Sequence, residues 1–139
     1  YRSGTENVPG IIGIGTAAEI AKNDIEENYS YLCKLEKYFI KMLDSHSFNY
    51  RLNGDSNHKV PWIFNIAFFD ITAEDMVDKL GEFCFSKSSA CSKGNYPSHV
   101  LEAMGLNEDW INHSVRLSFS KYTTMQQIDL FCKKLGKLV

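Results

Sequence analysis

The sequence has no large excess of charge of either sign and no long apolar run. Its 15 basic and 17 acidic residues give a net charge of -2 and are spread along the chain, so no basic surface for nucleic acid or for an anionic membrane is indicated. No apolar stretch approaches the roughly 18 residues that a membrane span needs, and the first residues lack the basic and apolar regions of a signal peptide. We therefore expect no nucleic-acid partner, no membrane association, and a location in the cytoplasm or an organelle matrix.

Cysteine is also sparse. The four residues, Cys33, Cys84, Cys91 and Cys132, include no C-x-x-C pair, so they indicate neither a disulfide framework nor a structural zinc site. We interpret them as separate thiols and expect no resident metal. The chain has no initiating Met either, and we expect a fragment or a processed piece of a longer protein.

The chain of 139 residues, 44% of them hydrophobic, is long enough for one domain with its own core. Hydrophobic spacing predicts a mostly buried helix over 8–21, further helices over 29–43, 72–80, 97–104 and 124–138, and strands over 63–69, 83–85 and 114–119. The segments 44–59 and 106–113 are expected to be a polar loop and an irregular link.

The predicted elements indicate an α+β fold of about three strands and four or five helices, with the helices covering one face of the sheet. Strand 63–69, helix 72–80 and strand 83–85 follow one another as a crossover unit. Such a unit pairs its two strands in parallel or places them around an intervening strand.

The loop around Cys91 is the first candidate for chemistry. Ser86 to Gly94 is rich in serine and lysine, a composition that favours an exposed loop. The ammonium groups of Lys87 and Lys93 would favour the thiolate, which is the nucleophilic form of cysteine. An incidental surface cysteine is an equal alternative on composition alone. His99 is a candidate base, with a helix-capping or packing role as its alternative.

Arg116 is the second candidate. Segment 114–119 alternates, so Val115, Leu117 and Phe119 share one face and Arg116 points to the other. An arginine in a central strand needs an anionic partner, either a carboxylate of the protein or that of a ligand. The residues alone favour the internal ion pair.

Read in order, the motifs resemble the C-terminal part of the cysteine desulfurases of the NifS/IscS type. Residues 2–8 read RSGTENV, similar to that family's R-[SA]-G-T-E-N-V, and residues 60–68 resemble its L-P-x-x-x-N-[IV]-S-F strand. Residues 88–94, SSACSKG, resemble its G-S-A-C-[ST]-S-G loop, and 115–124 resemble its [IV]-R-[FL]-S segment followed by [FY]-T-T. The resemblance covers nearly the whole chain.

This resemblance implies the small C-terminal domain of a fold-type I pyridoxal-phosphate enzyme over 1–139, in which residues 1 to about 22 are the tail of a helix from the large domain. The activity implied is conversion of L-cysteine to L-alanine, with sulfur transferred to Cys91 as a persulfide. Arg116 would hold the substrate carboxylate. Thr5 would reach the cofactor phosphate of the neighbouring subunit in a homodimer.

The implied sulfur acceptor is a scaffold protein for iron–sulfur clusters or a thiolation pathway, and Cys91 is at most a transient iron–sulfur ligand.

The chain departs from the family pattern at Lys87, Ser88, Lys93, Ala67 and Lys121. Residues 56–59 (SNHK) mimic the family's S-x-H-K cofactor-lysine motif, but they follow residues 2–8, where the family's motif precedes them. We interpret the match as a coincidence, so this chain alone is expected not to hold the cofactor covalently and to be inactive. A non-catalytic sulfur-relay or scaffold-binding module of the same fold is the alternative.

Overall fold

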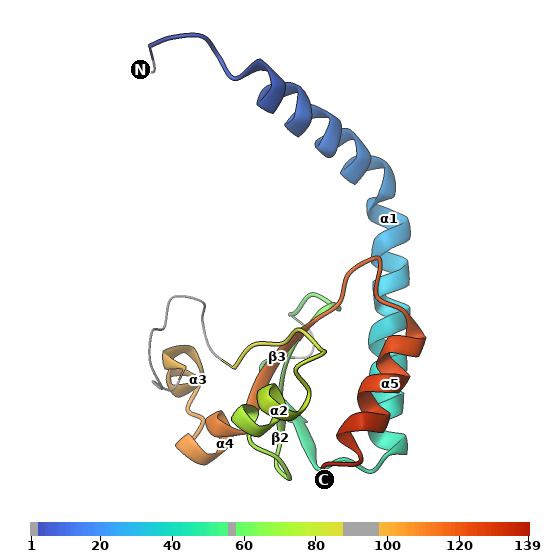
Figure 1. Ribbon diagram of the computed structural model, residues 1–139, viewed down its shortest axis with the longest axis vertical. Coiled ribbons are helices and arrows are strands. Elements are labelled where there is room, and N and C mark those ends of the chain that lie inside the picture. The colour runs from blue at the N-terminus through green and yellow to red at the C-terminus, as the bar shows by residue number, and fades with distance from the viewer. Residues whose placement is uncertain (1–2, 56–57, 88–97) are drawn as a thin grey trace. The chain divides into compact units, whose positions relative to one another are not determined.

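The computed structural model describes residues 3–55, 58–87 and 98–139. The elements in chain order are α1 (Val8–Ser45), β1 (Tyr50–Leu52), β2 (Ile63–Phe68), α2 (Ala73–Lys79), α3 (His99–Ala103), α4 (Glu108–Asn112), β3 (Ser114–Ser118) and α5 (Met125–Leu135) (Figure 1). The expected α+β class, with a three-stranded sheet and a long N-terminal helical segment, is confirmed.

The chain divides into two compact units, residues 1–31 and 32–139. The described part of the first unit is an extended start followed by the first turns of α1. Most of its large apolar side chains are exposed: Ile11 by 57%, Ile12 by 63% and Ile14 by 72%. The prediction of a mostly buried helix over 8–21 is therefore wrong for this chain, because no described residue covers those side chains.

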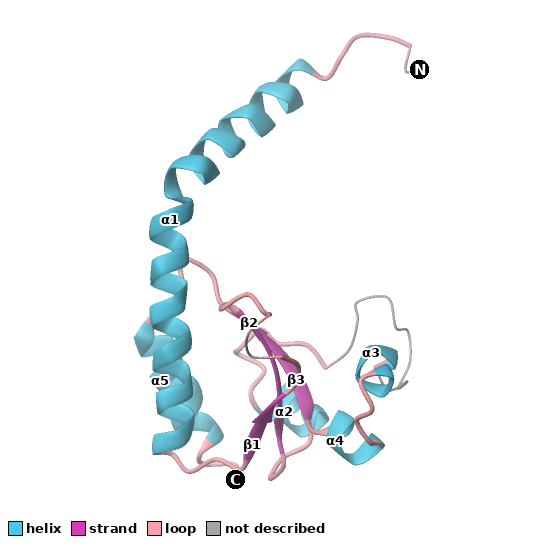
Figure 2. Cartoon of the chain, turned by 180° about the vertical axis from the view of Figure 1, so that it is seen from behind, coloured by secondary structure: helices cyan, strands magenta, loops and turns pink. Residues whose placement is uncertain are grey.

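The second unit is built on an antiparallel sheet in the order β1-β2-β3. Its apolar face carries Phe64, Ile66 and Val115, which are at most 2% exposed. The part of α1 after residue 31 and helix α5 run side by side along this sheet (Figure 2). Phe39 of α1 contacts Phe64, Phe119 and Phe131 in this core, so the expectation that helices cover one face is met here.

Two helix starts follow from local sequence. The Thr72 hydroxyl accepts a hydrogen bond from the Asp75 amide at the start of α2. Thr124 and Gln127 form a capping box at the start of α5, which pairs amides that the helix leaves without an internal partner. Both were predicted from the residues.

Four local predictions are wrong. One continuous helix replaces the two predicted over 8–43, the polar loop 44–59 contains β1, and the link 106–113 contains α4. Residues 83–85 form no strand; the pairing there is a single antiparallel bridge between Ser86 and Arg116. Because β3 is antiparallel to β2, the backbone at Ser86 has the same direction as β2, and β3 lies between the two. This is the second of the two crossover arrangements expected.

No helix among the described residues has the length and hydropathy needed to cross a membrane.

Candidate functional site

Arg116 lies on β3, and its side chain is exposed. β3 is the last of the three strands, but at Arg116 it is flanked by β2 on one side and by the bridge to Ser86 on the other. Its backbone amide donates to the Ser86 carbonyl at 2.8 Å and its carbonyl accepts from the Ser86 amide at 3.1 Å. No carboxylate of the described residues forms an ion pair with the Arg116 guanidinium, so the internal pair that the residues alone favoured is not found there.

Asn65 is the direct neighbour of Arg116 across the sheet. The two residues are partners in the β2–β3 register, so their side chains project from the same face. On the other side of β2, the backbone amide of Asn53 donates to the backbone carbonyl of Asn65 at 2.8 Å. Asn53, Asn65 and Arg116 therefore form a polar row across the sheet.

The side chains of Asn53, Asn65 and Ser114 are linked by hydrogen bonds. Asn53 Nδ2 donates to Asn65 Oδ1 at 2.6 Å and to Ser114 Oγ at 2.9 Å. Ser114 is only 1% exposed, and its hydroxyl donates to the Trp110 carbonyl at 2.9 Å. These hydrogen bonds fix the orientation of the side-chain amides of Asn53 and Asn65.

A second arginine on the same face is already engaged. Arg51 is the register partner of Ala67 on β2, and its guanidinium carbon lies 4.5 Å from the centroid of the Trp110 ring. That distance suits a cation–π contact. Of these two arginines, only Arg51 has its guanidinium held by a ring contact among the described residues.

Thr5 lies in the unit formed by residues 1–31 and is exposed. Gly4 before it has φ of +107°, a backbone conformation that suits glycine. Thr5 and Arg116 lie in different units.

Cys91 and Lys93 lie outside the described residues. Of the groups expected to assist Cys91, Lys87 has its Nζ 3.7 Å from Glu74 Oε1, with both side chains largely exposed. His99 is the first residue of α3 and is exposed. The other histidines contact local groups: His46 Nδ1 lies 2.9 Å from the Met42 carbonyl oxygen, and His58 Nδ1 lies 2.5 Å from Asp55 Oδ2.

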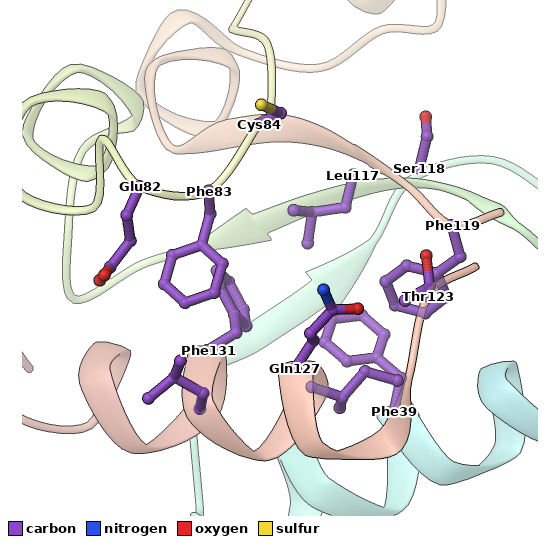
Figure 3. Close-up of a pocket in the computed structure, with 12 residues that line it drawn as sticks. Phe39, Glu82, Phe83, Cys84, Leu117, Ser118, Phe119, Thr123, Gln127 and Phe131 are labelled. Carbon is purple, nitrogen blue, oxygen red and sulfur yellow. The ribbon is translucent and has the colours of Figure 1, made fainter.

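A cavity of about 410 Å³ opens between β3 and α5 (Figure 3). Its lining is mainly apolar, with Phe83, Leu117 and Phe119 among its walls and Cys84 at its edge. The lining has one charged residue, Glu82, and no lysine or arginine. A phosphorylated pyridine aldehyde such as pyridoxal phosphate requires a lysine and cationic or amide groups for its phosphate, so this cavity does not fit it.

Lys59, from the segment that mimics a cofactor-lysine motif, is engaged within the protein. Its Nζ pairs with the Glu36 carboxylate and lies 5.0 Å from the centroid of the Phe64 ring. These contacts give Lys59 a structural role.

The three described thiols differ in environment. Cys84 is exposed, Cys33 is partly buried and Cys132 is buried. Burial, together with the nearby Asp129 carboxylate, raises the pKa of Cys132 to about 12, so its thiol stays neutral near pH 7. Among the described residues, no three His, Cys, Asp or Glu side chains come together to hold a metal ion.

Sequence reasoning missed the side-chain contacts of Asn65 and Asn53 and their position beside Arg116. Asn65 interrupts an apolar strand, which was a signal for a buried or paired polar group, whereas Asn53 was interpreted only as part of a turn. Their relation to Arg116 depends on strand register, which the sequence does not state.

Comparison with known proteins agrees with this picture. Residues 1–131 match the family described as aminotransferase class-V. Two curated relatives, both named cysteine desulfurase IscS, are 34% identical: that of Rickettsia bellii over 142 residues and that of Neisseria meningitidis over 143 residues. Each alignment covers 99% of this chain and 35% of the relative, so the chain spans about a third of the length of these relatives.

Solved structures show the same likeness. A NifS-like protein superposes with a TM-score of 0.79 at 28% identity, covering 98% of this chain and 34% of its own. The NifS-like protein of Rickettsia africae gives 0.79 at 29% identity, covering 99% and 36%. SspA, solved in complex with cysteine, gives 0.59 at 25% identity, covering 88% and 33%. The resemblance to cysteine desulfurases expected from the motifs is confirmed, and the chain belongs to the aminotransferase class-V family.

Proposed function

We propose that this chain is the small C-terminal domain of a pyridoxal-phosphate-dependent cysteine desulfurase. Residues 1 to about 22 would then be the tail of a helix that leads from a large domain. The single observation that carries the proposal is Arg116: its side chain is exposed and projects beside the amide of Asn65, and no described carboxylate pairs with it. Its planar fork suits the carboxylate of an amino-acid substrate.

The residues have distinct roles in the proposed reaction. Arg116 holds and orients L-cysteine by its carboxylate. The Cys91 thiolate forms an S–S bond with the substrate sulfur while the C–S bond of the substrate breaks. The electron pair of that bond stays with the substrate carbon, which takes up a proton to give L-alanine, and Cys91 is left as a persulfide. Pyridoxal phosphate, when bound, supplies an electron sink for that carbon.

The cofactor would be held mainly by residues outside this chain. Thr5 would contribute a hydroxyl to the cofactor phosphate of a neighbouring subunit in a homodimer. Because Lys59 pairs with Glu36, the lysine that binds the cofactor would come from the large domain. The isolated chain is accordingly proposed to be inactive.

The sulfur would leave through an external acceptor, a scaffold protein for iron–sulfur clusters or a thiolation component, in the cytoplasm or an organelle matrix. The composition of residues 86–94 predicts an exposed loop, from which a persulfide on Cys91 could reach such a partner. The buried Cys132 could not.

The test is made in the complete enzyme loaded with pyridoxal phosphate. Cys91→Ala should abolish formation of sulfide and alanine from L-cysteine while the cofactor absorbance is retained. Cys84→Ala is the matched control, because Cys84 is an exposed thiol seven residues away in the chain, and it should keep full turnover. Persistent turnover by the Cys91 variant would overturn the proposed function.

A further inference from the structure

We propose that the side-chain amide of Asn65 is a second donor to the carboxylate that Arg116 binds, and that Asn53 sets the orientation of this amide. The inference rests on the proposed function, since it takes Arg116 to be the substrate-carboxylate residue. It adds a substrate contact on β2 to the one on β3.

The first step is the separation of Asn65 and Arg116. The Phe68 amide donates to the His113 carbonyl at 3.1 Å, and the Phe119 amide donates to the Trp62 carbonyl at 2.8 Å. Hydrogen-bonded pairs recur at every second residue of an antiparallel ladder, so Asn65 and Arg116 fall at a pair without mutual backbone hydrogen bonds. Such pairs have Cα atoms about 4.5 Å apart and bring their side chains closest together.

The second step is the orientation of the Asn65 amide. The Trp110 carbonyl can only accept, so the Ser114 hydroxyl uses its one hydrogen to donate to this carbonyl. Ser114 Oγ must then accept from Asn53, which identifies the Asn53 atom facing it as Nδ2. The same Nδ2 donates to Asn65, so the Asn65 atom that faces Asn53 is Oδ1.

This leaves Asn65 Nδ2 as the free end of the amide. It has no hydrogen-bond partner among the described residues. The fully buried side-chain polar atoms without a partner in the described chain are Asn53 Oδ1 and Trp110 Nε1, so the unpaired Asn65 Nδ2, on a partly exposed side chain, is not fully buried. Its two N–H groups are therefore available to a ligand.

The third step is complementarity to a carboxylate. The Arg116 fork offers parallel N–H donors to both oxygens, and a carboxylate has further lone pairs to accept a bond from an amide. An arginine and an amide on the same sheet face thus match one carboxylate. Nδ2 is a neutral donor, so it adds a hydrogen bond without repelling Arg116.

The experiment measures binding in the complete enzyme loaded with pyridoxal phosphate, from the change in cofactor absorbance. The probes are L-alanine and ethylamine, which share an amine and differ by a carboxylate. Asn65→Asp keeps the acceptor for Asn53 but replaces the donor with a charged oxygen. Asn65→Ala removes the donor without adding charge, so it provides a second test if the first variant folds poorly.

The preference is the ratio of the affinity for L-alanine to the affinity for ethylamine. Both Asn65 variants should lower this preference by about 10-fold or more, because a charge-assisted hydrogen bond is lost. Affinity for ethylamine should stay near the wild-type value, which separates substrate contact from a general loss of structure. Ser118→Ala is the control, because Ser118 is an exposed residue on the same strand and face as Arg116, and it should leave the preference unchanged.

The outcomes distinguish the two proposals. If Arg116→Lys lowers the preference and both Asn65 variants keep it, the inference about Asn65 is overturned while the role of Arg116 stands. If Arg116→Lys also keeps the preference, both the inference about Asn65 and the role of Arg116 in the proposed function are overturned.

Discussion

Phe39 of α1 meets Phe64 of β2 edge to face, with ring centroids 5.1 Å apart and an interplanar angle of 66°. Phe39 is 1% exposed and Phe64 is 2% exposed. The pair therefore joins the helical layer to the sheet that carries Asn65 and Arg116, and its packing sets the geometry of the strand on which Asn65 lies.

Replacing Phe39 by alanine should be strongly destabilising. The ring also contacts Phe119 and Phe131, so its removal leaves a cavity with few atoms able to fill it. We expect a loss of about 3–5 kcal/mol in the free energy of unfolding, measured by urea denaturation. Ile63→Ala is the control, because Ile63 is 42% exposed, and it should cost far less. Equal losses for the two variants would contradict the described core.

Local signals in the sequence predicted the helix starts, since a cap involves residues three apart. Thr72 and Thr124 could be identified in that way. Strand β1 was missed because its three residues lie in a polar segment and their pairing with β2 is a tertiary contact.

The candidate site was predictable only in part. Arg116 was found because it breaks an alternating strand, whereas its proximity to Asn65 depends on register. The exposure of Ile14 was not predictable, because apolar composition indicates that a side chain needs a partner and does not say whether the same chain supplies it.

The capping box of α5 gives a second prediction. Thr124→Ala removes the acceptor for the Gln127 amide, at 3.3 Å, and leaves a helix amide without its partner. We expect a loss of about 1 kcal/mol in the free energy of unfolding. Thr124→Ser keeps the hydroxyl and should retain most of the stability in the same urea titration. A serine variant as unstable as the alanine variant would show that the cap contributes nothing.

Cys132 gives a prediction on pH. Burial is the main reason that its pKa in the folded protein is about 12, above the ordinary cysteine value of 9.0. Below pH 9 both the folded and the unfolded states hold this proton. Between about pH 9 and 12 the unfolded state releases it first, so stability should fall as pH rises, by about 1 kcal/mol per pH unit in this window.

Cys132→Val isolates this contribution, because valine is apolar, of similar size and does not titrate. The difference in unfolding free energy between wild type and variant should be constant from pH 7 to 8.5 and should then shift in favour of the variant by pH 10.5. Parallel curves over the whole range would show that the Cys132 thiol stays protonated in both states or ionises equally in both.

Lys59 gives the last prediction, which tests the interpretation of the segment SNHK. Its Nζ pairs with Glu36 and lies over the Phe64 ring, so in the complete enzyme Lys59→Met should retain the cofactor absorbance and the turnover of L-cysteine. The loss of a partly exposed ion pair and a cation–π contact should cost about 1 kcal/mol or less in unfolding free energy. Lys79→Met is a suitable control, since Lys79 forms a more exposed pair with Asp75, 3.3 Å away. If Lys59→Met abolished the cofactor absorbance while Lys79→Met preserved it, Lys59 would be the cofactor lysine, and the proposal that a large domain supplies this residue would have to be abandoned.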